Sequence, residues 1–204
     1  MKWIEKQAEG MFKDWDTNGL DHPNVKFLME WVERKGKNLA ILDVGCGNAE
    51  VADMLHEKGH EVIGLDLPEV VAKIRHDKLY GRYYGLDLNQ EHFPFPDDKY
   101  DIIYCASVIE HLWNDSFLLT NIREHLKDDG VAIITIPSKI NISERHCRFY
   151  PPVEWMRLVS AFGFDVFEVK DFHGPSMKDH LDKEGELWCK RCLSRNMWAL
   201  RRTK

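Results

Sequence analysis

Short apolar runs alternate with segments of helical hydrophobic periodicity between residues 38 and 138, and this alternation constrains the fold more than any other feature. The runs are rich in Val, Ile and Leu, as expected for strands that are buried on both faces. Because a helix returns the chain to the same end of a sheet, strands connected in this way run parallel. The sequence therefore predicts an α/β fold, a Rossmann-like doubly wound sheet of about seven strands.

The same pattern places the individual elements. The turn-forming run Asp128-Asp129-Gly130 is expected to end one helix before the next strand begins. We expect strands at residues 39–44, 61–67, 82–88, 101–108, 131–137, 165–169 and 197–202. We expect helices within residues 21–36, at 49–58, from 68 to about 75, at 117–127 and at 151–162.

Length and charge indicate one globular domain. The 204 residues carry a net charge of −6, which disfavours nucleic acid as a partner because its binding needs a basic face. Five scattered cysteines suit a reducing compartment, and no apolar run is long enough to insert into a membrane. We expect a cytoplasmic monomer or homodimer, with 1–37 as an N-terminal helical flap, 38–138 as the ligand-binding core and 139–204 as the substrate side.

The run Ile41-Leu42-Asp43-Val44-Gly45-Cys46-Gly47 joins an expected strand to an expected helix through a Gly-x-Gly turn. Glycine has no Cβ, so the backbone of such a turn can approach a ligand closely. The helix that follows presents unpaired N–H groups at its N-terminus. We therefore expect a nucleotide-like ligand here, in contact with Asp43, Gly45, Cys46 and Gly47.

Three further expected strands end at the same edge of the sheet, where open α/β sheets bind ligands. Asp66 lies 19 residues after Gly47, a position from which an acidic side chain can accept both ribose hydroxyls. The third strand end offers a carboxylate and an apolar wall for a purine, and the fourth offers small residues. The contacts expected at these ends are Asp66, Leu67, Asp87, Leu88, Cys105 and Ala106.

A dinucleotide is the competing ligand for this loop. Its fingerprint has a third glycine, for close helix–strand packing, where this chain has Glu50. Its pyrophosphate would lie at the helix N-terminus, and nearby carboxylates would oppose that charge. Asp43 instead suits a ligand that bears an ammonium or a sulfonium group. S-adenosylmethionine carries both groups together with a ribose and an adenine, so we favour it over NAD.

Residues 38–138 resemble a class I S-adenosylmethionine-dependent methyltransferase of the small-molecule type, with motifs like those of ubiquinone and menaquinone methyltransferases. Beyond Pro151 the resemblance is fainter: one stretch resembles the family's helix and sixth strand, and Asn-Met-Trp-Ala-Leu-Arg-Arg resembles its last strand, which inserts antiparallel at the edge. The four matching motifs are ILDVGCG, EVIGLDLPE, GLDLNQEHFPFPDDKYDIIYCASVIEHL and LKDDGVAIITIPS.

The resemblance implies roles for the residues at the strand ends. Gly45 and Gly47 would approach the methionine part of the cofactor, with Asp43 beneath it. Asp66 would bind the ribose. Asp87 and Leu88 would flank the adenine, and Cys105 would close the floor of the site. A structural alternative for Asp43 and Asp87 is that their carboxylates cap loops.

Glu110-His111 is the best candidate for a general base, because it follows the fourth strand at the mouth of the expected site. In ubiquinone-type O-methyltransferases a Glu-x-x-Glu-His run at this place is associated with a metal. Ser107 stands where the first of those carboxylates would be, so no metal is expected. The alternative is that Glu110 and His111 cap the next helix or order the loop.

The segment Arg145-His146-Cys147-Arg148-Phe149-Tyr150 mixes charge, imidazole and aromatic rings in a loop, where substrate-binding residues often lie. Arg145 and Arg148 could hold an anionic group of the acceptor, together with Tyr150. His146 is a second candidate base. Alternatively, the arginines pair with Glu144 and Glu154.

These features predict methyl transfer from S-adenosylmethionine to an O-, N- or C-nucleophile of a small molecule, by in-line displacement and mainly through positioning. S-adenosylhomocysteine would be the product. Two other functions stay open: a non-catalytic protein that binds the cofactor or regulates a partner on the same fold, and an NAD-linked oxidoreductase.

Overall fold

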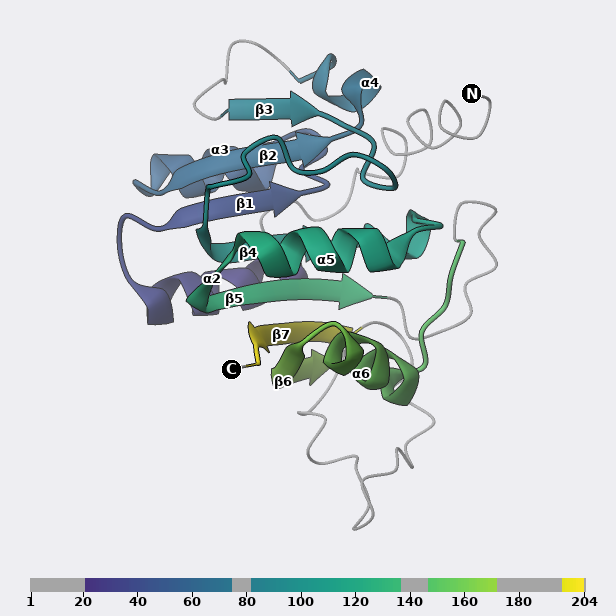
Figure 1. The fold of residues 1–204 in the computed structure, drawn as a ribbon. Helices are drawn as coiled ribbons and strands as arrows, with labels where there is room; N and C mark the ends of the chain where they lie inside the picture. The colour runs from purple at the N-terminus through teal and green to yellow at the C-terminus, as the bar shows by residue number, and fades with distance from the viewer. Residues whose placement is uncertain (1–20, 75–81, 137–146, 172–195, 204) are drawn as a thin grey trace.

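The computed structural model describes residues 21–74, 82–136, 147–171 and 196–203. Its centre is a seven-stranded sheet with the order β3-β2-β1-β4-β5-β7-β6 (Figure 1). Neighbouring strands among β1 to β5 pair in parallel, whereas β7 is antiparallel to both β5 and β6. The strands are β1 (Ala40–Val44), β2 (Glu61–Asp66), β3 (Arg82–Gly85), β4 (Tyr100–Ala106), β5 (Leu126–Ile136), β6 (Phe164–Asp171) and β7 (Asn196–Arg202).

The doubly wound α/β fold and the antiparallel last strand are therefore confirmed. The expected position of that strand at the edge of the sheet is wrong, because β7 lies between β5 and β6 and the edge strand is β6. Leu200 and Ala199 of β7 are fully buried, as expected for a strand with a neighbour on each side.

Helices cover both faces of the sheet (Figure 1). One core lies under α5 and α6, where Leu119 and Trp155 are fully buried, and the other lies under α2 and α3, where Leu28 and Leu55 are. The helices are α2 (Pro23–Lys35), α3 (Glu50–Glu57), α4 (Pro68–Val71), the 3-10 turn η3 (Ile109–His111), α5 (Asp115–His125) and α6 (Pro152–Ala161). In the part of the chain that the structure describes, no helix is long and apolar enough to cross a membrane.

Helix α2 has the start and end that the sequence predicts. The His22 side chain accepts a hydrogen bond from the Asn24 N–H (3.3 Å), Pro23 occupies the first turn, and Gly36, with φ of 110°, ends the helix. Apolar residues at helical spacing, among them Phe27 and Trp31, are buried against the sheet. The helix is thus a packed layer of the domain, and a role for residues 1–37 as a flap stays a prediction.

Two expected elements differ from the structure. Strand β5 begins at Leu126, so the predicted helix end at Asp128-Asp129-Gly130 lies inside a strand. Leu126 is fully buried and pairs with Tyr100, and an irregular register beside that pair accommodates the turn-forming residues. Tertiary pairing therefore overrides local turn propensity here. Helix α4 ends at Val71, before the expected residue 75.

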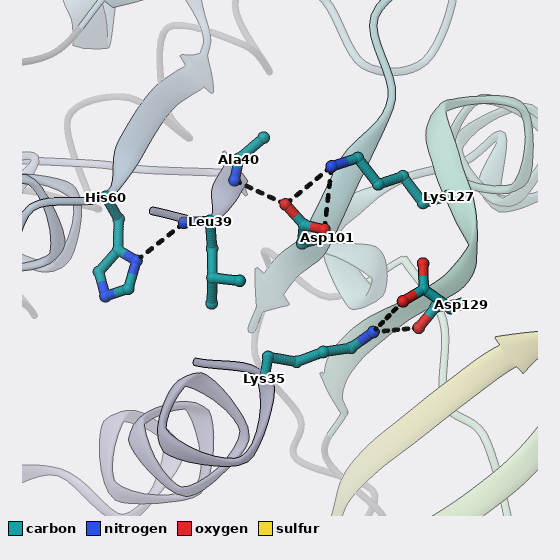
Figure 2. Close-up of polar contacts among 7 residues, drawn as sticks. All are labelled: Lys35, Leu39, Ala40, His60, Asp101, Lys127 and Asp129. Carbon is teal, nitrogen blue, oxygen red and sulfur yellow. Dashed lines mark hydrogen bonds and ion pairs between the residues drawn. The ribbon is translucent and has the colours of Figure 1, made fainter. Parts of the chain in front are cut away.

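The amino ends of the central strands are closed by structural polar contacts (Figure 2). The Asp101 carboxylate accepts the Ala40 N–H (2.8 Å) and both its oxygens accept from the Lys127 ammonium (2.9 Å each). Lys35 at the end of α2 donates to the backbone and the carboxylate of Asp129. These charged side chains make structural contacts at the amino edge of the sheet. The opposite, carboxyl edge is therefore the place where we look for a ligand site.

Candidate active site at the carboxyl edge of the sheet

The loop after β1 adopts a conformation that needs glycine at Gly45. The residue has φ of 78°, and a Cβ there would overlap the side chain of Val108, which lies directly against it. The N–H groups of Gly45 and Cys46 both donate to the Leu65 carbonyl, at 2.7 and 3.0 Å. The loop is thus a turn that is held against β2 by two backbone hydrogen bonds.

Asp66 ends β2 and connects the glycine loop to the next turn. Its two carboxylate oxygens accept the N–H groups of Gly47 (2.9 Å) and Leu67 (2.7 Å), and the side chain is buried. Burial raises the pKa of Asp66 to about 6, and the two backbone donors oppose that rise. Each oxygen keeps a second lone pair, so the carboxylate can still accept hydrogen bonds from a ligand.

Asp43 lies in β1 one residue before the strand ends and is also buried. Burial is the main cause that raises its pKa to about 7, and the neighbouring charge of Asp66 adds to the rise. Two buried carboxyl groups so close together disfavour an anionic ligand and favour a cationic one. The thiol of Cys46 is mostly buried beside them, and its pKa is raised far above the usual range, so it stays protonated.

The loop after β3 holds Asp87 in a turn. One oxygen of its carboxylate accepts the Asn89 N–H (2.9 Å), and the other accepts from the Gln90 side chain (2.6 Å). This is the loop-capping arrangement that the sequence left as an alternative for Asp87. Its effect is to fix Leu88, which is buried in the core beside Leu86, so a contact of Asp87 with adenine stays a prediction.

Asn89 is a site-building residue that the sequence did not indicate. Its side-chain oxygen accepts the N–H groups of Trp113 (3.0 Å) and Asn114 (3.2 Å), and its carbonyl accepts from the Asn114 amide (2.9 Å). These bonds join the loop after β3 to the loop after β4. No sequence signal pointed to Asn89, because asparagine in a loop is common and its partners lie 24 and 25 residues away.

The end of β4 brings Cys105 and Ala106 beside the glycine loop, since Cys105 pairs with Val44 of β1. Cys105 is fully buried, and burial raises the pKa of its thiol well above the usual range, with the carboxyl groups of Glu110 and Asp43 adding to the effect. The thiol therefore stays neutral, and its role as the floor of the site stays a prediction. Ala106 is partly exposed at the strand end.

Glu110 and His111 lie in η3, directly after that strand end. The Glu110 side chain is fully buried, and its carbonyl accepts the N–H groups of Cys147 (2.8 Å) and Arg148 (3.3 Å). The backbone at Glu110 therefore orders the segment that carries Arg148, and the role of its carboxylate as a base or as a loop-ordering group stays a prediction. His111 is half-buried, so its imidazole is the more accessible of the two candidate bases.

Arg148 and Tyr150 converge on Asp115, the first residue of α5. The Arg148 guanidinium lies 3.4 Å from the Asp115 carboxylate and donates to the Trp113 carbonyl (2.7 Å), and the Tyr150 hydroxyl donates to the same carboxylate. Asp115 therefore takes the place of Glu154, the surface partner considered for Arg148. Arg145 and His146 lie outside the described residues, so their predicted roles are unchanged.

Comparison with known proteins agrees with this architecture. A family model described as a methyltransferase domain matches residues 17–169. A probable S-adenosylmethionine-dependent methyltransferase of Mycolicibacterium smegmatis is 30% identical over 152 residues, which cover 68% of this chain and 57% of that protein. A ubiquinone biosynthesis O-methyltransferase of Rickettsia prowazekii is 27% identical over 148 residues, with 66% and 58% covered.

Solved structures share the fold at low sequence identity. A TehB-like S-adenosylmethionine-dependent methyltransferase from Corynebacterium glutamicum has a TM-score of 0.68 and 17% identity, over 98% of this chain and 96% of that one. The 1,6-didemethyltoxoflavin-N1-methyltransferase of Burkholderia thailandensis has a TM-score of 0.69 and 18% identity, over 100% and 86%.

The sheet with its reversed β7 is the fold of these solved structures, and the matching family model places the domain in the methyltransferase class. The chain belongs to the methyltransferase domain family, and a probable S-adenosylmethionine-dependent methyltransferase is among its relatives. It spans little more than half the length of the curated relatives it matches, 57% and 58% for the two above.

Proposed function

We propose that this chain catalyses methyl transfer from S-adenosylmethionine to a small-molecule acceptor. The observation that carries the proposal is the pair of buried carboxyl groups, Asp43 and Asp66, beside a glycine loop in which a Cβ at Gly45 has no room. A cationic nucleoside matches this arrangement in charge and in its ribose hydroxyls.

The residues present fit the cofactor. Asp66 can accept ribose hydroxyls while it keeps its two backbone bonds, and the loop from Gly45 to Gly47 would lie against the methionine part. Asp43 supplies negative charge beneath the loop. The apolar surface for an adenine comes from Leu88, Cys105 and Ala106. A pyrophosphate would meet both carboxylates, which disfavours the NAD-linked alternative.

Chemistry at this site depends mainly on position. When bound, the cofactor supplies a methyl group on a sulfonium, which is already activated toward a nucleophile. The chain's residues then have to hold the acceptor in line and exclude water, which is where most of the rate would arise. His111 is the proposed base for an acceptor that must lose a proton. Across the described ranges, no three His, Cys, Asp or Glu side chains gather as metal ligands would.

A small molecule is the favoured acceptor. The net charge of −6 opposes binding to a polyanion. A ubiquinone biosynthesis O-methyltransferase and a toxoflavin-precursor N-methyltransferase are among the relatives and fold neighbours, so both oxygen and nitrogen acceptors fit the fold. We place the reaction in the cytoplasm on the basis of the scattered cysteines.

The test is transfer of label from methyl-labelled S-adenosylmethionine to a metabolite extract, with the Asp66→Ala protein as the control. We expect labelled small molecules with the unaltered protein, and affinity for S-adenosylhomocysteine that is weaker by about 1–3 kcal/mol in the variant. Tight binding of S-adenosylhomocysteine without any transfer would favour the non-catalytic alternative. Higher affinity for NAD than for S-adenosylhomocysteine would favour an oxidoreductase.

A further inference from the structure

Two polar side chains, those of Asn24 and Thr135, connect helix α2 to the ends of β5 and β4. The Asn24 amide donates to the Thr135 hydroxyl oxygen (3.3 Å), and that oxygen also accepts the Ser107 N–H (3.0 Å). The Ser107 N–H lies 3.3 Å from the Thr135 carbonyl as well. Thr135 is fully buried and pairs with Ala106 across the sheet. The backbone at Ser107 is therefore held by both acceptors of one residue.

Ser107 needs such support because of its conformation. Its φ is 57°, in the left-handed region that is unfavourable for a residue with a Cβ. Non-glycine residues persist in that region where surrounding contacts hold them, and such positions concentrate at functional sites. Here the two contacts to Thr135 hold the residue that directly follows β4.

The next residue reaches the glycine loop. Val108 is buried, and its side chain occupies the space that a Cβ at Gly45 would fill. The conformation of Ser107 decides where Val108 lies, because the two residues share a peptide unit. The contacts thus run without a break from Asn24 through Thr135, Ser107 and Val108 to Gly45.

We propose that Asn24 and Thr135 are positioning residues for the methyl donor: they hold Ser107 in its left-handed conformation, which keeps Val108 against Gly45 and fixes the glycine loop. This inference rests on the proposed function, because it assigns the donor to that loop. It also connects helix α2 through direct contacts to the proposed donor site.

The residue types support a role beyond packing. Thr135 stands among Ile133, Ile134 and Ile136, where valine would fill the same volume without a hydroxyl to satisfy. Asn24 is buried, and its side-chain oxygen has no hydrogen-bond partner among the described residues. An apolar side chain would avoid that unfavourable burial. Packing alone therefore does not require a polar side chain at either position. The hydrogen bonds that meet at the Thr135 hydroxyl explain why both residues are polar.

The test first removes the Thr135 hydroxyl and then, in a double variant, replaces Ser107 by glycine, which needs no support at positive φ. Thr135→Val should weaken binding of S-adenosylhomocysteine roughly three- to tenfold in calorimetry, because Ser107 loses one of its two acceptors. The double variant Thr135→Val with Ser107→Gly should regain most of that affinity, since glycine adopts positive φ without strain. Thr120→Val is the matched control: its hydroxyl bonds within α5, to the Ser116 carbonyl (2.9 Å), and the affinity should not change.

Amide hydrogen exchange gives a second readout that needs no ligand. The N–H groups of Gly45, Cys46 and Gly47 are all hydrogen-bonded, and Thr135→Val should speed their exchange by a similar factor, with rescue by Ser107→Gly. Unchanged exchange in Thr135→Val, or a double variant as impaired as the single one, would overturn the proposal. If the unaltered protein does not bind S-adenosylhomocysteine, the proposed function fails, and the exchange data alone decide whether the loop is positioned in this way.

Discussion

The proposed donor side and the proposed acceptor side of the carboxyl edge are built by different means. On the donor side, Gly45 to Gly47 are shaped by backbone conformation, and Asp66 binds a Gly47 amide 19 residues away. On the acceptor side, Arg148 and Tyr150 reach Trp113 and Asp115, each 35 residues away, through their side chains. The difference teaches that variants should separate the two: changes in the glycine loop should abolish donor binding, while changes at Arg148, Tyr150 or Asp115 should leave donor binding intact.

Gly45→Ala is expected to have the largest effect. The new Cβ would overlap Val108 and would also hold an alanine at φ of 78°, so the loop must move. We expect affinity for S-adenosylhomocysteine to fall by about 3 kcal/mol or more, close to loss of binding in calorimetry.

Gly59→Ala is the matched control for this variant. Its φ of 87° imposes the same backbone strain, but nothing lies within 4 Å of the added Cβ, and the residue follows α3 away from the donor loop. It should lower the free energy of unfolding by about 1 kcal/mol and leave donor affinity unchanged. Equal donor affinities for the two variants would show that contact with Val108 does not shape the loop.

An intermediate effect is expected from pH, through the two buried carboxyl groups of the donor side. The pKa values of Asp43 and Asp66 are raised to about 7 and about 6 from an ordinary value of 3.8, so the folded protein binds more protons than the unfolded chain between these limits. The free energy of unfolding of the ligand-free protein should therefore fall as pH rises from about 4 to about 7.

Donor affinity should change with pH in the opposite direction. A cationic ligand prefers both carboxylates ionised, so affinity for S-adenosylmethionine should rise between pH 5 and 8, by at least roughly tenfold. Urea unfolding and calorimetry across that range measure the two slopes. Asp66→Asn should remove the part of the stability slope between about pH 4 and pH 6 and the part of the affinity slope near pH 6. Affinity that is independent of pH would mean that these carboxyl groups do not face the ligand's positive charge.

The same contrast explains what the sequence could predict. Gly45, Gly47 and Asp66 were placed correctly at the ends of β1 and β2, because glycine conformation and strand ends are local properties that a short motif expresses. Asn89 and Asp115 were not anticipated as site-building residues. Each acts through partners in other segments, and neither residue type is unusual in a loop or at the start of a helix.

The misplaced helix end at Asp128-Asp129-Gly130 has a related cause. These residues have the local propensity for a turn, but the pairing of buried Leu126 with Tyr100 places the segment in β5. In both cases contacts between distant segments decide the outcome, and a single sequence carries no direct record of them.

Tyr150→Phe should give the smallest effect, confined to the acceptor side. It removes the hydroxyl that donates to the buried Asp115 carboxylate, which still keeps Arg148 as a partner. We expect the free energy of unfolding to fall by about 1–2 kcal/mol in urea titrations, with unchanged affinity for S-adenosylhomocysteine.

Tyr100→Phe is the control, because the Tyr100 hydroxyl is also buried but has no hydrogen-bond partner among the described residues. Removing it should leave stability unchanged or slightly higher. If Tyr150→Phe weakened donor binding as well, the Asp115 cluster would have to transmit its state through η3 to the end of β4. The two sides would then be coupled, and the conclusion that variants can affect them separately would be wrong.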